Sequence, residues 1–240
     1  MRYTIIFTFV IFIFFPRAIY TQTLSASEII EKSIAYHDPD GKLLKKNVTL
    51  KLIETRPNGS DRKSEVSFHI KKEKFKMNQN IDEHQVISAY SKGKVSFLFD
   101  GKKEFSKEQG EKYRLNEKRI LMMKNYYLYL WLMPIKLNDG GTNLNPLVKT
   151  VDFFGKESLE IRVTYDPDIG ADVWYFYFNP DSYALQGYRF YHDEEKNDGE
   201  YIILQDEVTH ENVRLPKERK WYTHKEDKFL GADILDLLSF

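Results

Sequence analysis

The run Val173-Trp174-Tyr175-Phe176-Tyr177-Phe178 decides the fold of this chain, because neither face of such a strand suits water. Side chains of a β-strand alternate between two faces, so the two tyrosines share one face and the tryptophan and two phenylalanines share the other. Aromatic residues also favour strands. A strand that is apolar on both faces must be covered on both by other parts of the chain.

Further alternating segments surround this run. Residues 159–165 precede it, and 184–192, 201–208 and 217–224 follow it after a turn at 179–182. Short turns between consecutive strands favour antiparallel pairing, since a parallel pair needs a long crossover. The C-terminal half is therefore predicted to be an antiparallel meander.

The N-terminal half shows the same period of two residues. Its alternating segments lie at 48–52, 66–70, 75–81, 86–90 and 95–99. The first segment ends in Pro57-Asn58-Gly59 and the last is followed by Asp100-Gly101, which are both turn sequences. A second antiparallel meander is expected here.

Two helices are predicted as well. Ser25 and Glu28 form a capping box that starts a short amphipathic helix, which ends in the turn-rich segment 37–41. A second helix, 120–133, is apolar on nearly every side and ends at Pro134. It is too short to span a bilayer, so it is either deeply buried or laid over a sheet with its far side against something else.

Together these elements predict an α+β fold in one domain, residues 23–240. No linker rich in serine, glycine or proline separates the two meanders. A sheet of this many strands curls when it does not close, and helices must then fill its trough. We expect a single large curved antiparallel sheet, a half-barrel, with helices covering its concave face.

The first 22 residues have the make-up of a secretory signal peptide. Arg2 is followed by an apolar run at 5–15, then by Pro16 and a more polar stretch. A retained membrane anchor is the alternative, but a span needs about 20 apolar residues. We expect cleavage and a periplasmic or secreted protein. The chain has no cysteine, which excludes disulfides, thiol catalysis and lipid attachment through an N-terminal cysteine.

The charge balance argues against two classes of partner. Basic and acidic residues number 36 each, so the formal net charge is zero. No global field draws such a protein to nucleic acid or to acidic membranes. We expect neither nucleic-acid binding nor stable membrane insertion, and the sequence leaves the oligomeric state open.

Histidines beside carboxylates are the candidates for catalysis or metal binding. Such clusters lie at 37–40, 82–84 and 192–195, and a histidine with carboxylates can bind a divalent metal or act as a base. All three clusters fall in expected turns, where histidine and aspartate are common for backbone reasons. No catalytic residue, metal ligand or cofactor is assigned, and a metal-dependent hydrolase that uses these turns stays an alternative.

The aromatic segments give the leading site hypothesis. A concave, mostly apolar cavity is what lipid-like ligands need, and the central helix and the aromatic strands are able to form one. The predicted ligand-binding residues are Tyr126, Tyr129, Trp131, Trp174, Phe176, Phe178, Tyr188 and Phe190. The other interpretation is that the same side chains form a well-packed core.

Several short segments also carry a family resemblance. They are AYHDPDG at 35–41, WYFYFNPDSYAL at 174–185, GYRFYHD at 187–193, DGEY at 198–201, RLPK at 214–217, RKWY at 219–222 and FLGADI at 229–234. Together they resemble a domain-of-unknown-function family of exported bacterial proteins. More distantly, the layout is similar to the LolA and LolB lipoprotein carriers, in which an opening helix precedes a half-barrel and helices follow a turn like Asp100-Gly101-Lys102.

That resemblance implies the half-barrel fold and suggests an acyl chain or another apolar ligand in its trough. The leading hypothesis is a non-enzymatic periplasmic binding or carrier protein for a lipid, an acyl chain or another apolar ligand. Its partner would be a lipid or an acylated protein. An envelope protein-interaction module without a small ligand is the first alternative.

Overall fold

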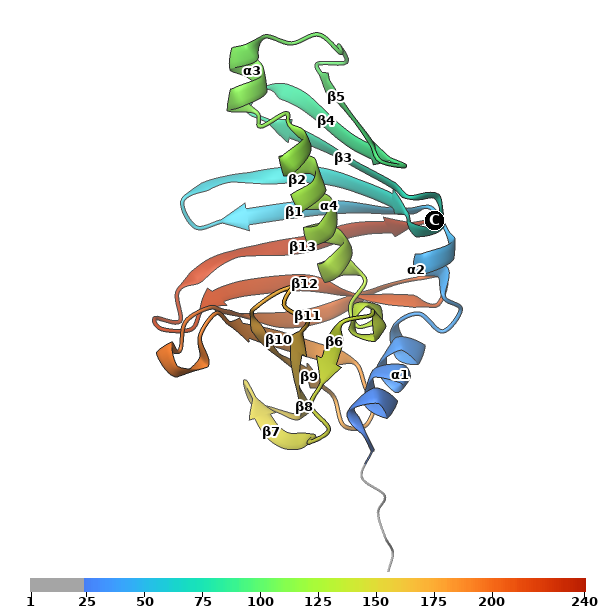
Figure 1. The fold of residues 1–240 in the computed structure, drawn as a ribbon, viewed down its shortest axis with the longest axis vertical. Helices are drawn as coiled ribbons and strands as arrows, with labels where there is room; N and C mark the ends of the chain where they lie inside the picture. The colour runs from blue at the N-terminus through green and yellow to red at the C-terminus, as the bar shows by residue number, and fades with distance from the viewer. Residues whose placement is uncertain (1–23) are drawn as a thin grey trace, which may run out of the picture.

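The computed structural model describes residues 24–240, and the predicted signal peptide at 1–22 lies outside them. Thirteen strands within the described range form one antiparallel sheet, in the order β5-β4-β3-β2-β1-β13-β12-β11-β10-β9-β8-β6, with β7 also paired to β8. The sheet is open, because β5 ends one side and β6 and β7 end the other (Figure 1). The predicted α+β fold with one large curved antiparallel sheet is confirmed.

The first meander is present as predicted. Its strands are β1 (Val48–Arg56), β2 (Gly59–His69), β3 (Lys74–Ile81), β4 (His84–Ser91) and β5 (Lys94–Phe99). Val48, Leu50 and Leu52 are buried on one face of β1, and more exposed residues alternate with them. The hairpin between β1 and β2 turns at Pro57 and Asn58, where the sequence predicts it.

The second meander is larger than the sequence indicated. Its strands are β6 (Thr142–Leu144), β7 (Lys149–Phe153), β8 (Lys156–Tyr165), β9 (Val173–Phe178), β10 (Leu185–Tyr191), β11 (Glu200–His210), β12 (Val213–Thr223) and β13 (Phe229–Ser239). Three of them, β6, β7 and β13, were not predicted. The last one matters most, because β13 pairs with β12 on one side and with β1 on the other and so joins the two halves of the sheet.

The described residues form four α-helices, of which the sequence predicts two. The helices are α1 (Ala26–His37), α2 (Lys42–Lys45), α3 (Lys107–Lys112) and α4 (Glu117–Trp131), with short 3₁₀ segments η1 (Ile70–Lys72), η2 (Ile135–Asn138) and η3 (Glu194–Lys196). Helices α1 and α4 lie where they were expected, whereas α2 and α3 were not predicted. The capping box of α1 is formed: the N–H of Glu28 donates to the Ser25 hydroxyl, and the N–H of Ser25 donates to the Glu28 carboxylate. Asn116 caps α4 with a single bond, in which its side-chain oxygen accepts from the N–H of Arg119, and the helix ends before Pro134.

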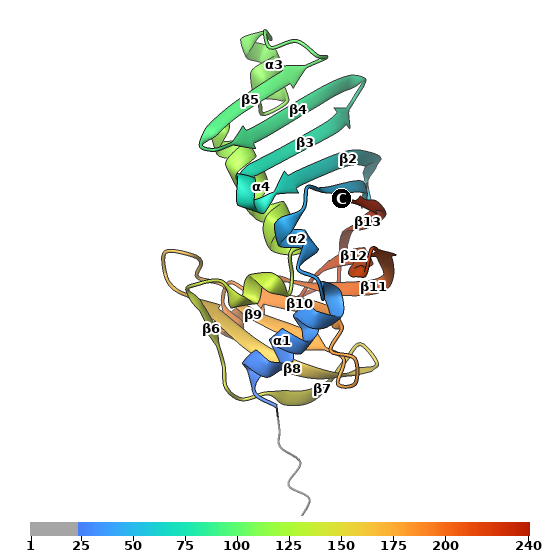
Figure 2. The ribbon, with the colours of Figure 1, turned by 90° about the vertical axis from the view of Figure 1, so that its right-hand side faces the viewer.

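Helix α4 lies across the concave face of the sheet, at a steep angle to the strands (Figures 1 and 2). One stripe, which includes Ile120, Met123 and Tyr127, is buried. On its other side Met122 is 49% exposed and Tyr126 is 38% exposed. The helix is therefore laid over the sheet, as in the second of the two predicted positions, but its far side is partly open where contact with another group was expected.

Both faces of β9 are covered, although by different means. Phe176 and Phe178 are fully buried in the main core on the concave side. On the convex side the Phe153 ring of β7 stacks on Tyr177 with the ring centroids 3.9 Å apart. Gly187 makes this possible, because a Cβ atom there would come within 2.4 Å of the Phe153 ring.

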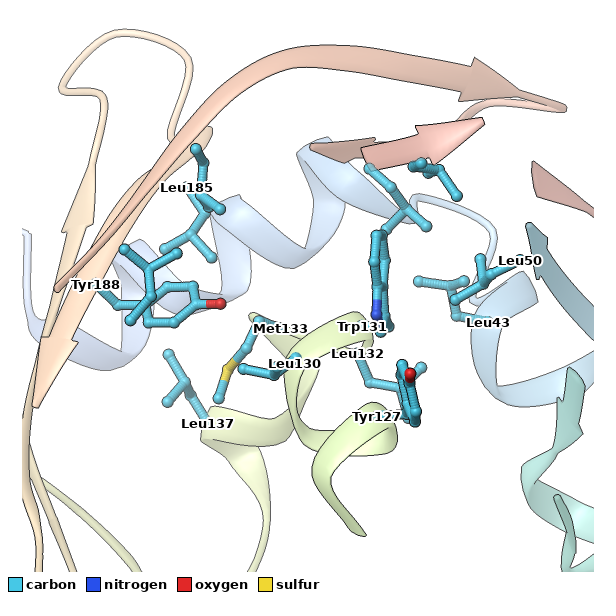
Figure 3. Close-up of a cluster of buried hydrophobic side chains, with 14 of the residues drawn as sticks. Leu43, Leu50, Tyr127, Leu130, Trp131, Leu132, Met133, Leu137, Leu185 and Tyr188 are labelled. Atoms are coloured by element: carbon cyan, nitrogen blue, oxygen red, sulfur yellow. The ribbon is translucent and has the colours of Figure 1, made fainter. Parts of the chain in front are cut away.

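The core is densest at the C-terminal end of α4. Figure 3 shows Trp131 and Leu132 of α4 beside Leu43 and Leu50 on one side, and Leu137, Leu185 and Tyr188 on the other. Helix α1 closes this end of the trough (Figure 2). Among residues 24–240, no helix has the length and apolarity that crossing a membrane requires.

Candidate ligand-binding cavity

A row of charged side chains crosses the sheet beneath α4. The strand register places Arg219 of β12, Asp233 of β13, Glu54 of β1 and Arg62 of β2 opposite one another in that order. We call these four residues the charged row. Directly opposed residues on neighbouring strands point to the same face, so the row lies across the junction of the two meanders.

The Glu54 end of the charged row is closed by hydrogen bonds. The Arg62 guanidinium donates to both carboxylate oxygens of Glu54 at 2.8 and 2.7 Å, and the Ser64 hydroxyl donates as well. Tyr127 of α4 donates to the same carboxylate at 2.9 Å and so ties the helix to the first meander. Burial alone raises the pKa of a carboxyl, but these donors hold the pKa of Glu54 below its ordinary value.

The other end of the row contacts the last turn of α4. Arg219 is fully buried, its guanidinium lies 3.5 Å from the centroid of the Trp131 ring, and it donates to the Leu130 carbonyl. Asp233 accepts a hydrogen bond from the Trp221 indole at 3.0 Å. Burial, with Glu54 close by, raises the pKa of Asp233. The junction beneath α4 is thus occupied by side chains, and a hollow of about 330 Å³ remains beside the first meander, between Lys124 and Leu128 of α4 and Tyr90 of β4.

The trough is not filled beside the second meander. A cavity of about 740 Å³ lies between the open side of α4 and the concave face of the sheet. Its lining includes Tyr126 and Tyr129 of α4, Tyr165 of β8, Trp174 of β9, Phe190 of β10, and Glu200 and Trp221 of the next two strands. The segment at 136–142 and the loop at 169–172 complete its rim.

Aromatic rings form the walls of this cavity in a connected series. The ring centroids of Tyr129 and Trp174 are 5.2 Å apart, and those of Trp174 and Phe190 are 4.7 Å apart. The Tyr129 and Tyr165 hydroxyls share a hydrogen bond of 2.6 Å, and burial raises the pKa of Tyr165 to about 12. Tyr126 stacks on Trp221 at the other end. These rings offer broad apolar faces to whatever enters.

Most charged groups of the cavity are engaged with a neighbour. Lys136 pairs with Asp139, and the His192 ring lies 2.8 Å from the Asp172 carboxylate. The Lys124 ammonium lies 4.4 Å from the centroid of the Tyr90 ring. Glu200 differs, because its carboxylate makes no hydrogen bond or ion pair with any residue of 24–240.

The eight residues predicted to bind a ligand divide into two groups. Tyr126, Tyr129, Trp174 and Phe190 line the cavity. The other four, Trp131, Phe176, Phe178 and Tyr188, are at most 1% exposed and belong to the core. Ligand binding by any of them stays a prediction, and the geometry offers only the first group to a ligand.

The histidine turns do not form a metal centre. In the 37–40 turn, His37 Nδ1 donates to the Arg214 carbonyl and Nε2 accepts from Leu185 N–H, while the Asp38 carboxylate accepts from the N–H groups of Lys42 and Leu43. In the 192–195 turn, His192 is exposed and pairs with one carboxylate. Across residues 24–240, no three histidine, aspartate or glutamate side chains are grouped to hold an ion.

Sequence reasoning found four of the residues that line the cavity and missed the rest, among them Tyr165, Glu200 and Trp221. A signal for Glu200 exists, because it continues the alternation of Ile202 and Leu204 and so puts a carboxylate on an apolar strand face. Tyr165 and Trp221 end up beside α4 only through the curvature of the sheet, so a local pattern does not reveal them.

Comparison with known proteins places the chain in a family. A family model described as "Family of unknown function (DUF6503)" matches residues 5–235. The chain belongs to this family. It matches no curated protein.

Solved structures resemble the DUF6503 chain in fold. The LolA superfamily protein NE2245 from Nitrosomonas europaea is 8% identical, with a TM-score of 0.52 over 91% of this chain and 94% of that one. A domain described as an outer membrane lipoprotein-sorting protein, from Vibrio parahaemolyticus, is 10% identical, with a TM-score of 0.51 over 89% and 91% of the two chains. At this identity the likeness shows the shared half-barrel and does not transfer a ligand.

Proposed function

We propose that this DUF6503 protein is a periplasmic binding or carrier protein that takes an apolar chain of a lipid or acylated protein into the cavity beside α4. One observation carries the proposal: the half of the trough beside the second meander is left open and is walled by aromatic rings. Its volume of about 740 Å³ lies in the range of about 300–1,000 Å³ that small-molecule sites have.

Two further points support this function. The LolA-type half-barrel is the fold of the lipoprotein-sorting domain that resembles the chain, and the predicted signal peptide accounts for a periplasmic location. The histidine and aspartate side chains of the two turns cap helices or pair with neighbours. They lend no support to a hydrolase.

Tryptophan fluorescence tests the proposal directly, because Trp174 and Trp221 line the cavity and Trp131 does not. A dibrominated monoacylglycerol has an uncharged head and quenches tryptophans that its chain touches. We expect saturable quenching of the delipidated protein. Trp174→Phe should lose a large part of the quenched signal, whereas Trp131→Phe should keep it.

Gly170 gives a second, steric test with a matched control. A Cβ atom at this cavity residue would meet open space, so larger side chains fit the backbone there. We expect Gly170→Trp to weaken binding of the monoacylglycerol at least tenfold, since the indole occupies part of the volume, and Gly170→Ala to leave binding unchanged. Unquenched fluorescence across chain lengths from ten to eighteen carbons would contradict the carrier function and favour the protein-interaction module.

A further inference from the structure

Glu200 stands out among the polar groups of the cavity. It pairs with Phe190 in the β10–β11 register, and Phe190 pairs with Trp174 in the β9–β10 register. The three side chains therefore form one row across the concave face, with the carboxylate beside two aromatic rings. A smaller hollow of about 210 Å³ shares Tyr126, Glu200 and Trp221 with the main cavity, so Glu200 lies where the two meet.

The charge of Glu200 has no partner within the described chain. The cations that line the two hollows are held elsewhere: Lys136 by Asp139, Lys124 over the Tyr90 ring, and Arg56 by Asp233 at 3.7 Å. His192 lies close enough for its charge to lower the pKa of Glu200, but its ring is hydrogen-bonded to Asp172. Partial burial of a carboxylate costs free energy, and an opposite charge brought in by a ligand would offset this cost.

The surroundings of Glu200 suit one kind of opposite charge. Aromatic faces attract organic cations through the ring quadrupole, and an ammonium group among several rings is the common form of this recognition. Phe190, Trp174, Trp221 and Tyr126 provide such rings in the same cavity as the carboxylate. A metal ion would need more oxygen ligands than this apolar wall provides.

Resting on the proposed function, we infer that the cavity binds an amphiphile whose head is a positively charged amine, with the amine against Glu200 and the rings of Phe190 and Trp221. The apolar chain then lies along Tyr129 and Trp174. An anionic head such as a fatty-acid carboxylate meets Glu200 and is disfavoured. Burial raises the pKa of Glu200, and the charge of His192 offsets only part of this rise.

Titration calorimetry with four probes tests this inference. Decyltrimethylammonium, 1-decanol and decanoate share one chain and differ in the charge of the head, and all are used below their micelle concentrations. Free choline carries the head without the chain. We expect the wild-type protein to bind decyltrimethylammonium about tenfold more tightly than decanol, and decanoate more weakly than either.

Two variants assign the preference to its residues. Glu200→Gln should bring decyltrimethylammonium to within about twofold of decanol while the affinity for decanol stays unchanged. Asp168→Asn removes one exposed carboxylate near the rim and should keep the full preference. This variant controls for the effect of losing any negative charge close to the cavity. Phe190→Leu should reduce the preference to an intermediate value because one ring is lost.

The outcomes separate this inference from the function on which it rests. Equal affinities for the three heads in the wild type, or a preference that persists in Glu200→Gln, would overturn the amine site and leave the carrier function standing. Failure of all decyl probes to bind would overturn both. Choline that binds as tightly as decyltrimethylammonium would show that the site recognises the ammonium group alone. That result would support the cation site but contradict the carrier function, because the apolar chain would add nothing to the affinity.

Discussion

The two halves of the trough under α4 differ in what fills them. Beside the first meander, Tyr127 donates a hydrogen bond to Glu54, and buried side chains leave a smaller hollow of about 330 Å³. Beside the second meander, Tyr126 and Tyr129 of the same helix face a cavity with aromatic walls. One helix therefore fastens itself to the sheet with one side and lines a site with the other.

This difference shows how a binding protein can keep a cavity open. A cavity lined only by apolar side chains tends to collapse, because burying its surface is favourable. The hydrogen bonds at Glu54 and the Arg219 contact with Leu130 fix the height of α4 above the sheet. The contacts beneath α4 at the charged row thus hold the helix away from the sheet and keep the cavity beside the second meander open.

The largest loss of stability should come from removing the ion pair between Arg62 and Glu54. Arg62→Met leaves the Glu54 carboxylate buried without its ion pair, and removing one partner of such a pair costs about 4 kcal/mol. Urea unfolding should report a loss of this order in the free energy of unfolding. Lys63→Met, an exposed neighbour on β2, should change it by less than about 0.5 kcal/mol. Similar losses in both variants would contradict the proposal that the charged row contributes more to stability than an exposed charge does.

A pH-dependent loss is expected at the end of the open half, where His37 of α1 holds β10 and β12 together. Burial lowers the pKa of His37 from about 6.5 to about 4. Between these pH values His37 is protonated in the unfolded chain but stays neutral in the folded protein. The free energy of unfolding is therefore highest above pH 6.5 and falls as the pH drops toward 4. The total loss is about 3 kcal/mol.

Urea unfolding between pH 8 and pH 4.5 measures this dependence. His37→Gln should be less stable than the wild type at pH 8 and should show a flatter profile below pH 6.5. A wild-type profile that matches the variant over this range would show that His37 does not control acid stability.

Tyr127 and Tyr129 of α4 make hydrogen bonds in different halves of the trough, so removing the hydroxyl of each compares the two halves. Tyr127→Phe removes a buried donor to a carboxylate and should cost about 2 kcal/mol, whereas Tyr129→Phe removes a neutral partner of Tyr165 and should cost about 1 kcal/mol. Thermal or urea unfolding of both variants provides the comparison. The reverse order would mean that the helix is fastened mainly at the cavity.

The smallest effect should be on head-group preference as the pH changes. A proton on Glu200 cancels its charge, and because burial raises the pKa of Glu200, this should occur above the range of an exposed glutamate. The preference for decyltrimethylammonium over decanol should fall between pH 7.5 and 4.5, by up to about 1 kcal/mol.

Other groups that face Glu200 must be accounted for in that titration. His192 and Asp172 lie on the β9–β10 side, Lys124 and Tyr126 on α4, and Arg56 at the end of β1. Glu200→Gln keeps all of them, so its preference should be low and nearly independent of pH. A pH dependence that survives in this variant would belong to His192 or Asp172 instead.

Local sequence determined the elements of this protein. The Ser25 capping box, the Pro57-Asn58 hairpin and the alternation along β1 each act over a few residues, so they could be read directly. Strand β13 was not predicted because Gly231 and Asp233 replace apolar residues on its buried face. Its alternation also breaks at Asp236, where its register with Lys51 and Leu52 of β1 shifts by one residue.

Tertiary structure alone decided the site. The charged row joins four strands that are distant in sequence, and only the pairing of β13 with β1 places Asp233 beside Glu54. Of the aromatic residues, Phe176 and Phe190 look alike in the sequence, yet one is core and the other lines the cavity because α4 crosses the sheet at an angle. The sequence thus determined which side chains are apolar, while the curvature of the sheet and the fixed height of one helix decided which of them stay open to a ligand.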